Sequence, residues 1–390
     1  WSSYYSGDST PDIERKDITF LQQLSGEGET PYGILDGSAS MSKGDSITHI
    51  PNYTVGLSGI PVPGTTNFDA RLFDASRYMT PLTLPGTLLR GAFADVNVLQ
   101  DALRLSLTHG REQSAVGSFE RGFNQSRDFY VDAGRVTLFP KDPNRHYAFN
   151  YASASGEDRD EYLTKHVYSL EGQHRIDKVA LNAELARDTK NTAKLSRIKW
   201  ENGSLRSALK FRDIDKNFTN VVGVPSNQGE IGAVWTANAQ GEKMGVDTTV
   251  DVYRDRLYPN AENPDAFNYD TSAHVRNTIT DDVWVDSNAR YIDTPGVISP
   301  RRNASLDTRL SRSFEIWNRR KATVFAGPSY QRSRYSNAPA SEYDRCAIIM
   351  GAQVPLAEGL ACYLNYEYSW LDEVLSNETY TPNVLNTGLT

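Results

Sequence analysis

The chain has 390 residues, with 41 basic and 49 acidic residues and a formal net charge of -8 at pH 7. This acidic balance argues against nucleic acid as a partner, because the neutralisation of phosphates needs a basic face. Apolar residues make up 38%, which is lean for a globular core, and no run of 18 apolar residues could form a transmembrane helix. A β-barrel with a wet interior would fit this composition, since only alternate strand residues need to be apolar.

Residues 1–65 differ in composition from the rest of the chain. Asp8–Lys16 is charged, and Ser25–Gly33 and Gly37–Ser46 are rich in glycine and serine. We expect either a leading pair of strands or a segment that lies in the lumen or on the periplasmic side of a barrel. Residues 66–390 are expected to form the barrel itself.

An alternation of apolar and polar residues with a period of two dominates the remaining chain. Val96–Leu107 could also be helical, but its leucines at every second position from Leu103 fit a strand better. Successive side chains of an extended chain point to opposite faces, so this alternation predicts half-buried strands. The clearest segments are residues 179–186, 205–212, 231–238 and 244–256.

Two properties of these segments favour a membrane barrel over a soluble sandwich. Their polar faces carry charge in mid-strand, as at Asp247 and Lys210, which a water-filled lumen tolerates. Their length is about 9–13 residues, which suits a tilted strand that crosses a bilayer, whereas strands of soluble sheets cluster near 5–6. Length is the better discriminator.

The connections between the segments alternate in length. Short polar turns are expected at residues 175–178, 202–203 and 240–241, and longer loops at residues 217–229, 257–267, 293–303 and 336–343. Short turns at one rim and long loops at the other are typical of outer-membrane barrels. Val384–Thr390 has the pattern of another strand, so we expect either a further strand after Thr390 or a chain that is one part of a larger barrel.

The two cysteines lie on either side of an expected turn at Pro355–Gly359. A hairpin centred on that turn brings Cys346 nearer to Glu367 or Tyr368 than to Cys362, so the register does not support a disulfide, although one stays open. We expect free thiols without a catalytic role.

The segment Asp344–Trp370 resembles the penultimate hairpins of Gram-negative outer-membrane β-barrel proteins of the porin and exporter type. In those proteins a strand ends at a short turn with proline or glycine and returns as an aromatic-rich strand, as Leu360–Trp370 does here. The resemblance covers roughly residues 66–390, is architectural, and lacks the terminal phenylalanine common in that class. It implies an antiparallel transmembrane β-barrel of about 16–18 strands in the outer membrane, a size that generally leaves an aqueous channel.

On this interpretation, strand residues divide into two groups according to their face. The lumen-facing candidates are Arg206, Lys210, Arg212, Asp247, Asp251, Arg276, Asp286, Arg290 and Arg309. The lipid-facing or interface candidates are Val246, Val250, Leu209, Trp235, Trp317 and Trp370. The luminal arginines either hold anionic solutes through bidentate contacts or pair with acidic residues to make the wall rigid.

The leading functional hypothesis is an outer-membrane channel for diffusion or export of polar solutes or polymer, with outer-membrane lipid as its surroundings. One alternative is a non-conducting structural barrel that anchors or scaffolds an assembly of the cell envelope or surface, whose other members would be its partners. Another is a secreted, soluble β-rich protein that binds glycans. The sequence predicts no catalytic residues, no metal site and no cofactor, since the six histidines are scattered.

Overall fold

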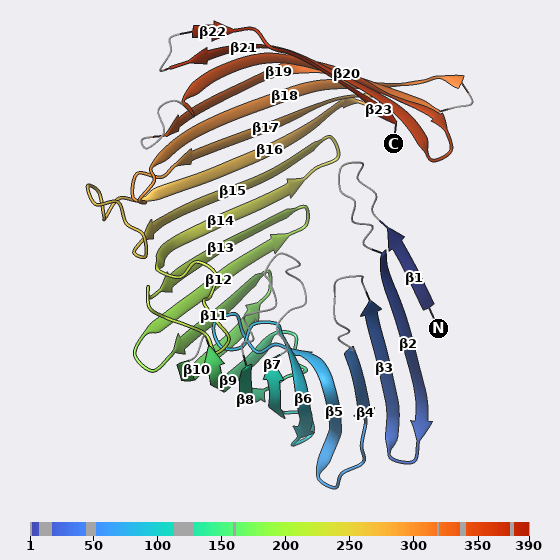
Figure 1. The fold of residues 1–390 in the computed structure, drawn as a ribbon, viewed down its shortest axis with the longest axis vertical. Coiled ribbons are helices and arrows are strands. Elements are labelled where there is room, and N and C mark those ends of the chain that lie inside the picture. Colours follow the sequence, from blue (N-terminus) through green and yellow to red (C-terminus); the bar gives the residue numbers. More distant parts are fainter. Residues whose placement is uncertain are drawn as a thin grey trace. The chain divides into compact units, whose positions relative to one another are not determined.

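The computed structural model describes residues 2–7, 18–43, 52–112, 128–158, 161–317, 320–335, 341–374 and 378–389. These residues form a 23-stranded antiparallel sheet (Figure 1). Its strands are β1 (Ser2–Gly7), β2 (Ile18–Thr30), β3 (Gly33–Lys43), β4 (Asn52–Ser58), β5 (Thr65–Arg77), β6 (Thr87–Val98), β7 (Leu103–Glu112), β8 (Asp128–Leu138), β9 (Arg145–Asp158), β10 (Glu161–Ile176), β11 (Val179–Arg187), β12 (Thr192–Asn202), β13 (Leu205–Ile214), β14 (Glu230–Gln240), β15 (Met244–Asp255), β16 (Asn268–Thr280), β17 (Val283–Asp293), β18 (Arg301–Glu315), β19 (Lys321–Tyr335), β20 (Tyr343–Ala357), β21 (Leu360–Glu373), β22 (Glu378–Tyr380) and β23 (Asn383–Leu389).

The all-β, antiparallel fold expected from the alternation is confirmed. The number of strands exceeds the expected 16–18 mainly because residues 1–65 contribute β1–β4. Each of these strands pairs with the next one in the chain, and β4 pairs with β5. Among the described residues, β1 pairs with β2 and β23 pairs with β21. Within the described ranges, no helix is long and apolar enough to cross a bilayer.

The chain forms two compact units. The first unit comprises Trp1–Arg175, Asn182–Ala193 and Asn217–Ser226, and the second comprises Ile176–Leu181, Lys194–Lys216 and Asn227–Thr390. In the first unit β1 to β10 pair with their neighbours in chain order, and in the second β13 to β21 do the same, with β23 beside β21. The division of the chain at residue 65 stays a prediction.

Directly paired residues of neighbouring strands share a face, so the registers sort the side chains of the second unit. One cross-strand row consists of Leu209, Trp235, Val250, Thr271 and Tyr291. The adjacent row, on the opposite face, consists of Lys210, Val234, Asp251, Asp270 and Ile292. We call the side of the first row the apolar face and the side of the second the polar face.

The first unit has the same two faces. On its apolar face Leu170, Phe149, Val136 and Leu105 form one row. On its polar face the adjacent row is Ser169, Asn150, Arg135 and Ser106. Two-residue side-chain periodicity therefore sets the two faces in both units, as the sequence pattern predicts.

The main core of the first unit lies on the polar face, where the connection Tyr78–Gly86 between β5 and β6 packs. Its Leu82 and Leu84 are buried. The Thr83 hydroxyl donates to Ser169 Oγ over 2.7 Å, and the Arg135 guanidinium donates to the carbonyl of Met79 over 2.9 Å. The covering segment therefore joins the sheet through both apolar burial and polar contacts.

A second segment, residues 217–226, packs in the same core through buried Phe218 and Val221. The turn residue Asp188 holds it, because its carboxylate accepts the backbone N–H of Thr219 over 3.2 Å and that of Asn191 over 2.6 Å. Burial raises the pKa of Asp188, but the amide hydrogen bonds stabilise the carboxylate more, so its pKa is lowered overall.

The expected alternation of connections is seen between β12 and β18. Short turns follow β12, β14 and β16, whereas the connections after β13, β15 and β17 are long (Figure 1). The long loop expected at residues 336–343 lies mostly outside the described residues. Both cysteines are free, as expected, and Cys346 pairs in register with Trp370 because the hairpin turns at residues 358–359 rather than at the centre of Pro355–Gly359.

Candidate functional site

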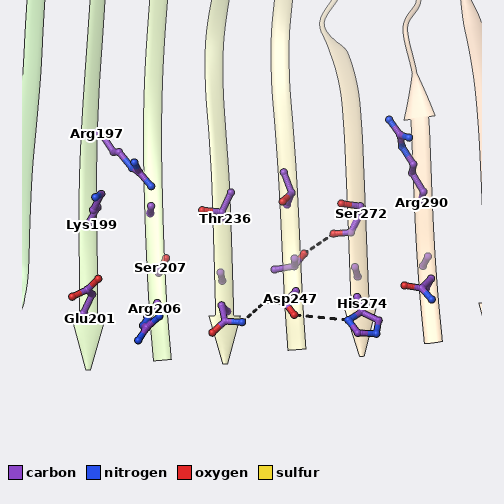
Figure 2. A pocket seen from close by; sticks show the side chains of 18 of the residues that line it. Arg197, Lys199, Glu201, Arg206, Ser207, Thr236, Asp247, Ser272, His274 and Arg290 are labelled. Atoms are coloured by element: carbon purple, nitrogen blue, oxygen red, sulfur yellow. Dashed lines mark hydrogen bonds and ion pairs between the residues drawn. The ribbon is translucent and has the colours of Figure 1, made fainter. Parts of the chain in front are cut away.

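A groove with a cavity volume of about 560 Å³ crosses the second unit from β12 to β18. Figure 2 shows its lining side chains, which come from successive strands of the sheet. The volume lies within the range of about 300–1,000 Å³ that small-molecule sites usually have. We refer to this feature as the groove.

The floor of the groove is a row of small side chains, most of them polar. In register, Ala208 pairs with Thr236, Thr236 with Thr249, and Thr249 with Ser272. Such short side chains leave space above the sheet, and their hydroxyl groups can both donate and accept hydrogen bonds. The row ends at β17 and β18 with Arg290 opposite Ser305.

The next polar row contains a histidine between carboxylates. The amide of Asn238 donates to Asp247, whose other oxygen lies 3.8 Å from Nδ1 of His274 (Figure 2). Nε2 of the same ring lies 3.7 Å from Asp286. These contacts fix polar side chains along one edge of the groove.

Most of the arginines expected on the polar face of β13 to β17 are paired. Arg212 is almost fully buried and contacts Glu230 over 2.6 Å and Asp251 over 2.8 Å. Arg290 forms a bidentate pair with Asp270. These pairs support the wall-stiffening role for those arginines.

Two further predicted arginines contact aromatic rings. Arg276 lies 4.0 Å from Asp286 and its guanidinium carbon is 5.4 Å from the ring centre of Trp284. Arg309 lies over Phe325 at 5.3 Å. A cation over an aromatic face is attracted by the ring quadrupole, so these two side chains are also oriented.

The structure brings only part of the predicted polar set together in the groove. Arg206, Asp247 and Arg290 line it. The other six share the polar face but are not among the lining residues: Lys210, Arg212, Asp251, Arg276, Asp286 and Arg309.

The residues predicted to face lipid or the interface lie on the apolar face, with one exception. Those on the apolar face are Leu209, Trp235, Val246, Val250 and Trp370, and the exception, Trp317, follows the end of β18. Whether these faces meet water and lipid stays a prediction.

Sequence reasoning missed the basic residues of β12. Arg197, Lys199 and Glu201 line the groove, beside Arg206 of β13 (Figure 2). The signal was present, because charged residues at 197, 199 and 201 alternate with Ile198 and Trp200. Arg135, which anchors the covering segment in the first unit, was missed although it alternates with Val136 in the same way.

Within the described parts of the chain, no three histidine, cysteine or acidic side chains are grouped so that they could hold a metal ion. The hydroxyl, amide and guanidinium groups of the groove are suited to hydrogen bonding and to anions.

No protein-family model matches the chain, and no curated protein matches it. Among solved structures, a bacterial polysaccharide outer membrane secretin gives a TM-score of 0.28 at 11% identity and covers 67% of this chain and 89% of its own. The P pilus usher (PapC) translocation pore gives a TM-score of 0.36 at 9% identity, and the match covers 96% of this chain and 95% of the usher chain. OccAB4 of Acinetobacter baumannii gives a TM-score of 0.25 at 9% identity, and the match covers 100% of this chain and 95% of the OccAB4 chain. Likenesses with TM-scores this low carry no weight for the function of this chain.

Proposed function

We propose that this protein is an outer-membrane channel, a β-barrel whose apolar face contacts lipid and whose polar face lines a path for the diffusion or export of polar solutes or polymer. The observation that carries the proposal is the inverted distribution of side chains over the two faces. Large side chains on the apolar face of the strands are exposed, whereas polar side chains on the opposite face are buried or line a groove.

The first unit shows this inversion clearly. On its apolar face Leu107 is 62% exposed and Leu170 59% exposed, whereas on its polar face Asn150 and Ser169 are almost completely buried. Soluble monomers rarely expose large contiguous apolar patches, because their contact with water is unfavourable. The acyl chains of lipid would cover such a face without the unfavourable contact with water. The backbone N–H and C=O groups of the antiparallel strands form their hydrogen bonds within the sheet, as a membrane requires.

The second unit supports the path. Its apolar face carries exposed Leu310, Ile348 and Leu364, while its polar face holds the groove with Arg206 and Asp247. A strand set of this size encloses an aqueous lumen when it closes into a barrel. Charged side chains on the inner wall would then select among solutes.

One observation favours the second candidate, a non-conducting structural barrel that anchors an envelope assembly. In the first unit Tyr78–Gly86 covers the polar face and buries Leu82 and Leu84 against it. A covered polar face leaves less room for a path. The secreted soluble alternative is disfavoured by the exposed apolar face, and the proposal includes no catalysis.

Planar-bilayer recording separates the channel from the structural barrel. We expect the purified chain to give discrete current steps, and charge reversal at the groove, Arg206→Glu, to shift the reversal potential towards cation selectivity. The matched control is Arg312→Glu, because Arg312 lies on the apolar face near the end of β18 and its reversal should leave selectivity unchanged. Inserted protein that carries no current would contradict the channel.

A further inference from the structure

The cations on the polar face of the second unit are unevenly paired. Arg212, Arg290 and Arg276 each have an acidic partner within 4.0 Å. In contrast, Arg197 and Lys199 of β12 and Arg206 of β13 form no ion pair with any carboxylate in the part of the chain that the structure describes. We call these three residues the basic strip.

The members of the basic strip are spread along the groove. Arg197 and Lys199 are alternate residues of β12, about 6.6–7 Å apart, which is shorter than the screening length of about 8 Å at physiological ionic strength. Arg206 of β13 lies further along the groove, beside Glu201 (Figure 2). The strip therefore offers one closely spaced pair of positive charges and one separate charge, which suits a ligand that carries more than one anionic group.

The rest of the groove presents groups that match sugar hydroxyls. Thr236, Thr249 and Ser272 supply hydroxyl groups along its floor, and Asn238 and Asn288 supply amides at its side. Each of these groups can donate and accept hydrogen bonds. The groove also crosses the sheet from β12 to β18, a span of roughly 25–30 Å at the usual strand spacing, which suits a linear ligand better than a compact one.

We propose that the groove binds a carboxylate-bearing saccharide chain, with the basic strip holding carboxylates and the floor hydroxyls contacting the sugar ring. This inference rests on the proposed channel, since it names the class of solute that would use the path. Arg197 and Arg206 can each present two parallel N–H donors to one carboxylate, whereas Lys199 acts as a point charge.

The test is a binding titration of the full-length protein in detergent micelles, which needs no current. The probes are a short oligogalacturonate, a neutral malto-oligosaccharide of equal length, and inorganic phosphate. We expect the oligogalacturonate to bind, and the variant Arg197→Gln/Lys199→Gln/Arg206→Gln to bind it at least tenfold more weakly. The matched control Arg309→Gln removes a charge from the same polar face outside the groove and should bind as the wild type does.

Three results would overturn the inference. They are equal affinity for the neutral oligosaccharide, equal displacement by phosphate at the same concentration, and equal loss of affinity in Arg309→Gln. Circular dichroism of each variant must match that of the wild type, and the single substitution Lys199→Gln repeats the test if the triple variant unfolds. Binding without bilayer current would contradict the channel alone, whereas current without binding would contradict this inference alone.

Discussion

The polar face of the first unit is covered, and that of the second unit is open. In the first unit Asn150 and Ser169 are buried beneath Tyr78–Gly86, and the Ser169 hydroxyl is satisfied by Thr83 and Asn150. In the second unit the equivalent row, through Thr236 and Ser272, forms the floor of a groove. Residues of similar chemistry therefore have opposite environments in the two units.

The difference follows from the connections and not from the strands. The connection between β5 and β6 carries leucines at positions 82 and 84, which are buried on the sheet. The connection between β15 and β16, residues 256–267, is rich in asparagine, proline and acidic residues, and its large side chains Tyr258 and Phe267 stay exposed. A connecting segment thus covers a polar face when its apolar side chains are buried on that face, since their burial provides the driving force.

The largest effect should come from the cover of the first unit. Replacing fully buried Leu84 by alanine removes packed apolar atoms and leaves a cavity, so we expect a loss of about 2–5 kcal/mol in the free energy of unfolding. Urea unfolding of the protein in micelles, followed by tryptophan fluorescence, measures this loss. The same change at Leu99, which is 70% exposed in a turn, should cost less than about 0.5 kcal/mol. Equal effects at the two leucines would show that Tyr78–Gly86 does not form a packed cover.

An intermediate effect is expected where the polar face of the second unit is locally buried. Arg212→Gln removes the cation between Glu230 and Asp251, so we expect about 3 kcal/mol of destabilisation, reduced by the partial exposure of both carboxylates. Arg290→Gln breaks the more exposed pair with Asp270 and should cost less than about 1 kcal/mol. The same urea titration compares the free energies of unfolding of the two variants. A larger loss for Arg290→Gln than for Arg212→Gln would contradict our view that Arg212 lies in a buried part of the polar face and Arg290 at the open groove.

The smallest effect concerns the tether of residues 217–226 in the first unit. The pKa of Asp188 is lowered in the folded protein, so its contribution to stability is present above its unfolded pKa of about 3.9 and is lost as the pH falls through the folded pKa. Asp188→Asn should therefore be less stable than the wild type from pH 7 to pH 5, and the difference should shrink towards pH 3. Urea unfolding at each pH gives this difference, and one that grows as the pH falls would contradict the tether.

The sequence predicts which residues share a face because side-chain alternation is local. Leu209, Val250 and Asp251 lie on the expected sides, since a slip by one residue would invert every side chain of a strand. The sequence does not predict that Tyr78–Gly86 covers the polar face of the first unit. The contact between Thr83 and Ser169, which fixes this cover, joins residues 86 positions apart. The pairing of Arg212 with Glu230 and Asp251 is likewise set by the registers of three strands.

The groove could have been found more completely from the sequence than it was. Arg197 and Lys199 follow the same alternation as Arg206, and only the omission of β12 from the strand segments hid them. The convergence of these three side chains on one groove, however, depends on strand pairing in space. The number of strands was underestimated for a different reason, since the glycine- and serine-rich composition of residues 1–65 obscures β2 and β3.

The most direct test of the central claim is the environment of two neighbouring strand residues on opposite faces. In a Cys346→Ala/Cys362→Ala background, Leu209→Cys and Lys210→Cys are each labelled with an environment-sensitive fluorophore and reconstituted into vesicles. We expect a lipid-borne quencher to quench the label at 209 and aqueous iodide to quench the label at 210. Quenching of both labels by iodide, with none from the lipid phase, would contradict a lipid-facing apolar surface.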